Sequence, residues 1–159
     1  MSSRRLQLVW SIKQAPEAVL KVAFASTDRT RVNQHFGSAE GFVVYEVTPD
    51  KATLVGLAEF AEEAMDGNEG KLAAKVDFLE GCAAVYVMAI GASAIKQLMS
   101  KGVQPIRIGE VDAVDDLLSD ISRAMSDGGV AWIDRAIAAQ AKAKAEDRFS
   151  HMEADGWQG

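Results

Sequence analysis

Residues 83–88 form an uninterrupted apolar run, Ala-Ala-Val-Tyr-Val-Met, that lies between two segments of helical character. In the flanking segments 71–79 and 91–102, apolar residues recur every three or four positions, as on one face of a helix. A short apolar strand between helices is typical of the centre of a sheet that is covered on both faces. Because residues 103–108 have the pattern of another short strand, this half of the chain predicts β-α-β units.

In the N-terminal half of the chain, the apolar residues follow a different pattern, which is typical of strands. Residues 20–25 and 41–47 are short runs rich in apolar, β-branched and aromatic side chains, and they predict two strands. The segment 48–51, Thr-Pro-Asp-Lys, has the residues of a tight turn. A third strand is expected from 52 to about 60, so that it forms an antiparallel hairpin with the second. Residues 61–70 are acidic and contain glycine, and we expect them to form a loop.

Together these segments predict an α/β fold: a five-stranded mixed sheet flanked by helices on both sides, in the order β-β-β-α-β-α-β-α. The last helix of this order is expected over 111–125, and Asp127-Gly128-Gly129 ends it. Residues 130–148 are rich in alanine and predict a helical C-terminal extension, which a polar tail follows over 149–159. The predicted organisation is an N-terminal arm (1–18), an α/β domain (19–129) and the helical extension with its tail (130–159).

The composition excludes several kinds of partner. The chain has 159 residues, with 17 Lys and Arg against 23 Asp and Glu, and its net charge is −6. An acidic protein without a basic cluster is repelled by nucleic acid and by anionic lipid, so neither is expected as a partner. No segment approaches the ~20 apolar residues that cross a bilayer. The single cysteine, Cys82, excludes an intrachain disulfide and fits a reducing cytoplasm, where we expect the protein to be.

Two loops are expected to meet at the carboxyl ends of the strands, where ligands of α/β proteins gather. If the first and fourth predicted strands are parallel neighbours, residues 26–38 lie beside residues 89–93. The second loop leads into a helix, whose free N–H groups favour an anion. His35 is therefore a candidate ligand for iron or zinc, and the alternative is that it hydrogen-bonds the loop backbone. The neighbouring Phe36 is expected to bury its ring and to anchor the loop.

The rest of the sequence offers no convincing catalytic set. It lacks a P-loop and the GxGxxG, GxSxG and HExxH motifs. Cys82 precedes the central strand, where a small buried residue is a better interpretation than a metal ligand. Asp28 and Glu46 are the best carboxylate pair for a magnesium-dependent nuclease or other hydrolase, which is the interpretation that the residues favour least.

Several motifs of the chain occur together in a known family. They are residues 21–26, the loop 32–38 with its His-Phe-Gly-Ser motif, Cys82, and residues 89–91, 96–98, 102–105, 147–149 and 156–159. Through these motifs nearly the whole chain resembles the NifX/NafY family of dinitrogenase iron–molybdenum cofactor biosynthesis proteins. Asn33 departs from the family pattern, because Asp is expected there in many relatives, and the departure removes a charge beside the histidine.

The resemblance implies a ribonuclease-H-like sandwich, without nuclease activity, that carries an iron–sulfur precursor of the iron–molybdenum cofactor. It also implies transfer of this cluster between the radical-SAM cofactor-building protein and the maturation scaffold, which is not an enzymatic role. The histidine of the motif implies that His35 is the metal ligand. Further contacts to the transiently bound cluster are expected from five other residues: Ser26, Asn33, Ser38, Gly91 and Ser93.

An alternative is that the chain is a protein–protein interaction or regulatory module of nitrogenase maturation. In that case the N-terminal arm, the helix over 130–148 and Trp157 would bind the maturation scaffold, and metal binding would be incidental.

Overall fold

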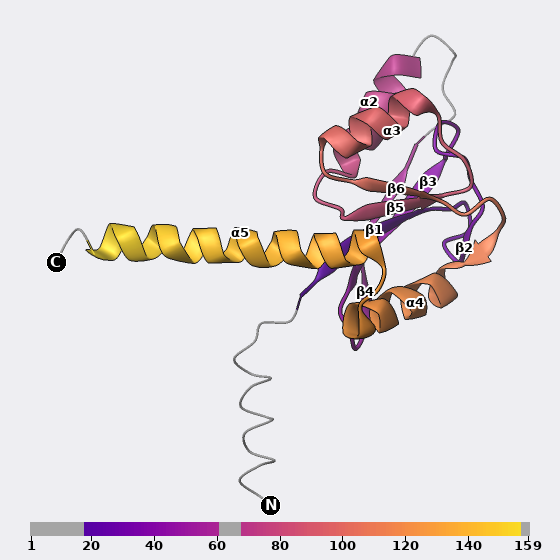
Figure 1. Ribbon diagram of the computed structural model, residues 1–159. Helices are drawn as coiled ribbons and strands as arrows, with labels where there is room; N and C mark the ends of the chain where they lie inside the picture. Colours follow the sequence, from indigo (N-terminus) through magenta and orange to yellow (C-terminus); the bar gives the residue numbers. More distant parts are fainter. Residues whose placement is uncertain (1–17, 61–67, 157–159) are drawn as a thin grey trace, which may run out of the picture.

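The computed structural model describes residues 18–60 and 68–156 (Figure 1). Almost all of the predicted N-terminal arm, most of the predicted acidic loop, and Trp157 lie outside these residues. Within them, five strands form one sheet in the order β4-β3-β1-β5-β6.

The central strand β1 (Leu20–Ala25) gives the sheet its mixed character. It pairs antiparallel with β3 (Gly41–Val47) on one side and parallel with β5 (Ala84–Val87) on the other. The sheet continues from β3 antiparallel into β4 (Ala52–Glu59), and from β5 parallel into β6 (Gln104–Arg107). These pairings confirm the predicted mixed sheet, its hairpin, and the parallel contact between the first and fourth predicted strands.

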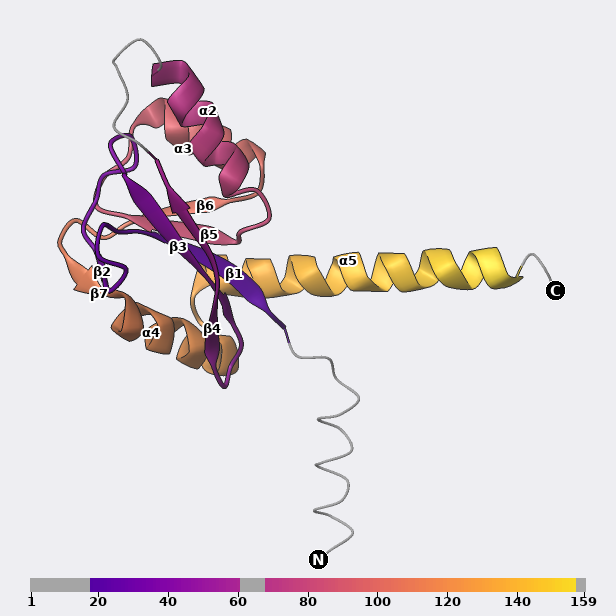
Figure 2. The same ribbon diagram turned by 180° about the vertical axis from the view of Figure 1, so that it is seen from behind.

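Helices cover both faces of the sheet, as Figures 1 and 2 show from opposite sides. The helices α2 (Asn68–Phe78) and α3 (Ala92–Ser100) pack on one face. The other face is covered by α4 (Val114–Asp127) and by the first turns of α5 (Ala131–Gly156). Since successive side chains of a strand point to opposite faces, alternate residues of β1 enter two separate apolar cores. The α/β class with helices on both sides is thus confirmed, while the ribonuclease-H-like assignment stays a prediction.

Two short strands are absent from the order that the sequence predicts. β2 (Arg31–Val32) and β7 (Asp112–Ala113) pair antiparallel in a separate two-stranded sheet. The predicted helix over 111–125 is therefore wrong at its start: α4 begins at Val114, whose N–H donates to the carbonyl oxygen of Thr30 at 2.9 Å. Strands of two residues are too short to show a period, and this pairing depends on a contact between segments far apart in the sequence.

Two helices are longer than their sequence patterns indicate. α2 begins at Asn68, inside the predicted loop, because a single glycine such as Gly70 costs a helix only about 1 kcal/mol. α5 continues to Gly156, so the segment predicted as a polar tail is helical over 149–156. No proline or glycine interrupts the sequence from Ala131 to 155, and an alanine-rich helix continues until such a residue ends it.

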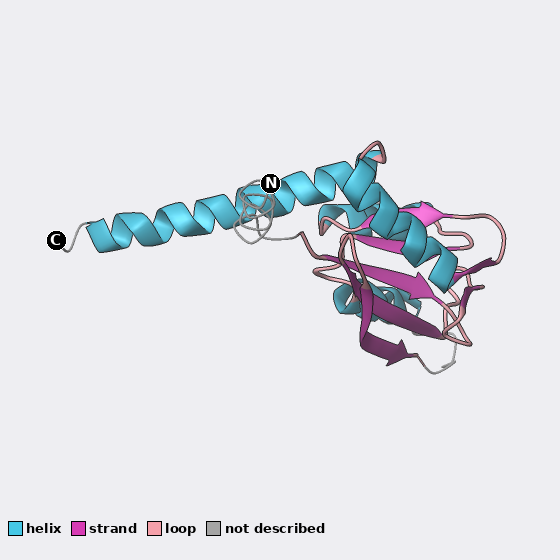
Figure 3. Ribbon diagram, turned by 90° about the horizontal axis from the view of Figure 1, so that it is seen from below, coloured by secondary structure: helices cyan, strands magenta, loops and turns pink. Residues whose placement is uncertain are grey.

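The first turns of α5 fix this helix to the sheet. Ile133 is buried, and the ring of Trp132 lies edge-on to that of Tyr86, with 6.3 Å between the ring centroids. The side-chain amide of Gln140 accepts a hydrogen bond from the N–H of Val19 at 2.9 Å and donates one to its carbonyl oxygen at 2.6 Å. Residues 141–147 are exposed, and Figure 3 shows α5 projecting away from the sheet. No helix within the described ranges is long and apolar enough to cross a membrane.

We expect Ile133→Ala to lower the free energy of unfolding by about 2–4 kcal/mol, because it leaves a cavity between α5 and the sheet. Urea denaturation followed by circular dichroism measures the change. Lys142→Ala, at an exposed position of the same helix, is the control and should change the free energy by less than about 0.5 kcal/mol. Equal stability of Ile133→Ala and the wild-type protein would contradict the anchoring by the first turns.

Candidate functional site

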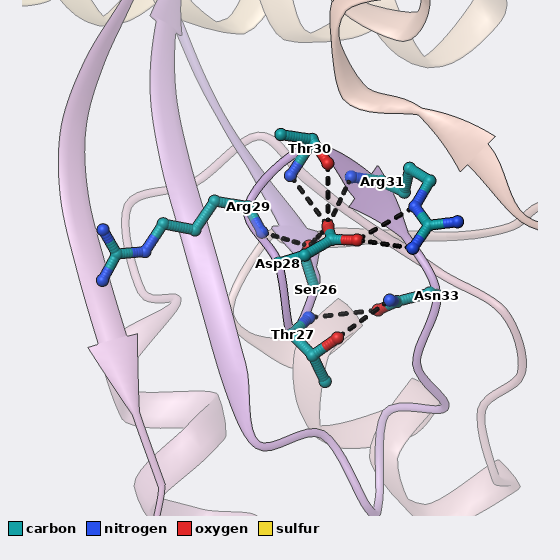
Figure 4. Close-up of polar contacts among 7 residues, drawn as sticks. All are labelled: Ser26, Thr27, Asp28, Arg29, Thr30, Arg31 and Asn33. Carbon is teal, nitrogen blue, oxygen red and sulfur yellow. Dashed lines mark hydrogen bonds and ion pairs between the residues drawn. The ribbon is translucent and has the colours of Figure 1, made fainter.

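The loop after β1 is organised by the carboxylate of Asp28 (Figure 4). Oδ1 accepts hydrogen bonds from the backbone N–H groups of Thr30 and Arg31, at 2.9 and 3.0 Å, and from the hydroxyls of Ser26 and Thr30, at 3.2 and 3.1 Å. Oδ2 accepts two from the guanidinium of Arg31, at 2.9 and 2.8 Å. The Thr30 N–H and the Arg31 side chain above all hold the pKa of Asp28 well below its usual value. Asp28 therefore fixes the turn from β1 into β2.

Asn33 closes the same loop. Its Oδ1 accepts a hydrogen bond from the N–H of Thr27 at 3.1 Å, and its Nδ2 donates to the Thr27 hydroxyl at 2.9 Å. An Asp at this position could accept from the same N–H and hydroxyl, so the departure from the family pattern leaves this contact possible. The buried hydroxyl of Ser26 likewise accepts from the N–H of Arg29 at 2.8 Å, besides donating to Asp28. The side chains of Ser26 and Asn33 thus shape the loop itself.

The segment after Asn33 lies alongside the segment that follows β5. The N–H of Met88 donates to the carbonyl oxygen of Gln34 at 2.9 Å, and the N–H of Phe36 donates to that of Ala89 at 2.8 Å. The side chain of Gln34 adds a contact, since its Oε1 accepts from the N–H of Glu40 at 2.8 Å. These contacts extend the parallel arrangement of β1 and β5, and they confirm that the two predicted loops meet.

His35 lies between these two backbone contacts. Its side chain is exposed and makes no hydrogen bond or ion pair with the residues that the structure describes. The neighbouring Phe36 is fully buried, as expected, and its ring centroid lies 5.7 Å from that of Phe42. The alternative role of His35, a hydrogen bond to the loop backbone, is therefore not found within the described ranges. The anchored backbone presents the imidazole to solvent.

The N-terminus of α3 follows two residues after the contact at Ala89. Gly91 is the N-cap residue, and no side chain caps the helix. The first N–H groups of an α-helix have no partner within the helix, so those of α3 can donate to an anion. Ser93, in the first turn, and Ser38, in the turn after Phe36, are both exposed. The structure thus brings Gly91 and Ser93 to the same edge of the sheet as His35.

Lys75, a residue that the sequence analysis does not single out, also contacts this turn. It lies on α2 and is only 3% exposed. Its Nζ donates to the carbonyl oxygens of Gly37 and Phe36, at 2.8 and 3.3 Å, and lies 5.8 Å from the centroid of the Phe60 ring. A sequence signal exists, because this lysine falls at helical spacing within an apolar stripe: Leu72, Val76 and Leu79.

The other candidate groups do not form a second site. Glu46 pairs with Lys21 near the start of β1, whereas Asp28 follows the end of β1, so the predicted carboxylate pair for a hydrolase is wrong. Among the described residues, no group of three or more His, Cys, Asp and Glu could hold a metal ion. Cys82 is buried before β5, and burial raises the pKa of its thiol to about 11, which keeps it protonated and a poor metal ligand at neutral pH.

The groups at this edge of the sheet have the chemistry to bind an anion or a metal. A neutral imidazole nitrogen is a good ligand for iron, and the N–H groups at the start of α3 favour negative charge. No base–nucleophile pair involves His35 within the described residues, because its side chain has no hydrogen-bond partner there. The site offers one exposed imidazole on a firmly held backbone.

The family of the chain follows from comparison with known proteins. Residues 18–124 match the family model described as "Dinitrogenase iron-molybdenum cofactor". The match covers more than half of the chain, which therefore belongs to this family, and the resemblance inferred from the motifs is confirmed. The chain is 44% identical to the protein NifX of Azotobacter vinelandii over 157 residues, which are 99% of each chain.

A longer protein and a solved structure are also similar to this chain. The FeMo cofactor biosynthesis protein NifB of Frankia alni is 32% identical over 111 residues, which cover 67% of this chain and 21% of NifB. The crystal structure of PH0822 superposes with a TM-score of 0.51 at 23% identity, covering 65% of this chain and 88% of that one. The first similarity shows the domain within a longer protein, and the second concerns the fold alone.

We expect Asp28→Asn to destabilise the protein at neutral pH, by an amount that shrinks in acid. The pKa of Asp28 is lower in the folded protein than in the unfolded chain, so its stabilising contribution is complete above the unfolded value, roughly pH 4. The contribution is lost as the pH falls from there through the folded-state pKa. Urea midpoints at a series of pH values measure the difference, and a difference that stays constant down to about pH 3 would contradict the assignment.

Proposed function

We propose that the chain binds an iron–sulfur precursor of the iron–molybdenum cofactor and carries it during nitrogenase cofactor biosynthesis. The cluster passes from the radical-SAM cofactor-building protein to the maturation scaffold. The chain acts in the cytoplasm as a carrier and catalyses no reaction. Its membership in the dinitrogenase cofactor family supports this proposal, as does its similarity to NifX and to a protein of FeMo cofactor biosynthesis.

The observation that carries the proposal is the exposed His35 on a backbone held against residues 88–89. An imidazole nitrogen binds iron without adding a negative charge, which suits a cluster that is itself anionic. The N–H groups at the start of α3 lie at the same edge of the sheet and favour the same charge. A single protein ligand also leaves the other metal positions open to the next protein in the sequence of transfers.

The remaining predicted contacts take two different roles in this proposal. Ser38 and Ser93 are exposed and are proposed to donate hydrogen bonds to the cluster. Gly91 contributes its backbone, and a Cβ built there would have no atom within 4 Å, so open space adjoins it. Ser26 and Asn33 act indirectly, because their side chains hold the loop that presents His35.

We expect His35→Ala to bind the precursor cluster more than about tenfold more weakly than the wild-type protein. The cluster is transferred anaerobically from a purified donor, and iron content with visible absorbance measures binding. His151→Ala removes the other histidine of the chain and is the matched control, which should bind as the wild type does. Equal binding by His35→Ala would place the ligand elsewhere.

The projecting part of α5 supports a second candidate function, docking on the maturation scaffold. Residues 141–147 are exposed, and the helix continues beyond the body of the protein (Figure 3). A helix with exposed sides can lie in the groove of a partner. In this alternative, α5 makes the chain an interaction module without a role as cluster ligand.

A chain that ends after Lys142 separates these two functions. It keeps Ile133 and Gln140, which hold α5 to the sheet, so we expect it to fold and to bind the cluster as the full chain does. If α5 is the docking element, the shortened chain no longer co-elutes with the maturation scaffold in size-exclusion chromatography. Undiminished co-elution would exclude docking through the projecting part of α5.

A further inference from the structure

The two outer strands of the five-stranded sheet differ in how their outer edges are protected. Unpaired N–H and C=O groups at a sheet edge attract another strand, so natural edge strands are commonly short, charged or interrupted by proline. β6 follows this rule, because it has four residues and includes Pro105 and Arg107. β4 has eight residues, and no charged residue or proline occurs between Lys51 and Glu59. Among the described residues, none pairs with the outer edge of β4.

The side chains of β4 are apolar as well as exposed. Leu54, Val55 and Leu57 are 47%, 45% and 44% exposed. Residues that lie opposite each other in an antiparallel pair point to the same face of the sheet. Leu54 lies opposite Tyr45 and, after a shift of register, Leu57 lies opposite Val43. Both β3 residues contribute to the core that α4 covers, so the two leucines lie on that face of the sheet.

This edge is complementary to itself when two copies of the chain meet in antiparallel orientation. A twofold axis places the same strand of each copy side by side, running in opposite directions. When the two strands overlap fully, Lys51 of each copy lies near Glu59 of the other, and the uncharged residues 52–58 lie between these two ends. The guanidinium of Arg29 lies 3.7 Å from Glu59, but both side chains are largely exposed, and such a pair contributes little.

Pairing through β4 also brings its apolar side chains together. A twofold axis perpendicular to the sheet keeps each face on its own side, so Leu54 and Leu57 of both copies gather on the face that α4 covers. The main-chain groups of the two edges bond each other, as they do when a strand is added to a sheet. The candidate site is not part of this contact, because β3 separates β4 from the strand β1 that leads to His35.

We propose that β4 is a dimerisation edge, on which the β4 strand of a second copy of this chain pairs antiparallel. The two sheets then form one continuous sheet with a candidate site on each copy. This inference goes beyond the proposed function and does not depend on cluster binding.

The first test measures the mass of the full chain in solution by size-exclusion chromatography with light scattering, over a range of concentrations. We expect the mass of two chains at high concentration and of one chain on dilution. Val55→Lys places a charge in the middle of the paired edge and should raise the dissociation constant by more than about tenfold. Val111→Lys is the matched control, because Val111 is 49% exposed and lies outside the five-stranded sheet, and it should dimerise as the wild type does.

The second test exchanges the charges at the ends of the strand. Lys51→Glu places like charges opposite each other at both ends of the pair and should weaken dimerisation several-fold. The double variant Lys51→Glu/Glu59→Lys restores opposite charges and should recover most of the affinity. Failure of the double variant to recover would contradict the antiparallel alignment.

Each remaining outcome identifies another occupant of the edge. A wild-type chain that stays monomeric at every concentration overturns the inference, and slow hydrogen exchange of the β4 amides in that monomer would show that another segment of the same chain covers the strand. A dimer that Val55→Lys leaves intact is formed through another surface, which overturns the inference as well. Since no cluster is present in these measurements, either failure leaves the proposed function standing.

Discussion

The parallel pairing of β1 with β5 is the contact on which the candidate site depends. It directs both strands toward one edge of the sheet, so the chain that leaves β1 and the chain that leaves β5 run side by side. The hydrogen bonds between residues 34–36 and 88–89 follow from this arrangement, and so does the position of the α3 N-terminus near His35. Both strands are covered by helices, where water does not compete for their hydrogen bonds. The backbone of the site is therefore held by buried strands, although the site itself lies at the edge of the sheet.

The loop that carries His35 is held by polar groups of its own, and the imidazole makes no hydrogen bond to any residue of the described ranges. Asp28 satisfies successive backbone N–H groups of the turn, and Asn33 ties the turn back to Thr27. A loop stabilised in this way loses little entropy when a guest binds, because its backbone is already ordered. Since His35 has no structural partner among the described residues, it can gain and lose a ligand without disturbing the fold.

The sequence predicts the features that are visible as a local pattern of apolar residues. The strands over 20–25 and 41–47 show in short apolar runs, and the meeting of the two loops follows once the first and fourth strands are parallel. The β2–β7 pair escapes prediction, because two residues per strand record no period. The contact of Lys75 with the turn after His35 is not predicted either, because a lysine on a helix normally faces solvent. The carbonyl oxygens that it contacts belong to another part of the chain. The sequence indicates His35 through the expected meeting of two loops and through its motif, whereas only the coordinates show that its side chain makes no hydrogen bond with the residues described.

The placement of the single thiol fits a carrier better than a permanent cluster site. A cysteine thiolate binds iron strongly and adds a negative charge, so a thiolate beside His35 would hold the cargo and oppose its transfer. Cys82 lies buried before β5, at the opposite end of that strand from the residues that pair with the His35 loop, and its raised pKa keeps it protonated. In the proposed carrier, affinity comes from one neutral ligand and from the N–H groups at the start of α3. None of these groups competes with the thiolates of a receiving protein, so the cluster can leave by ligand exchange alone.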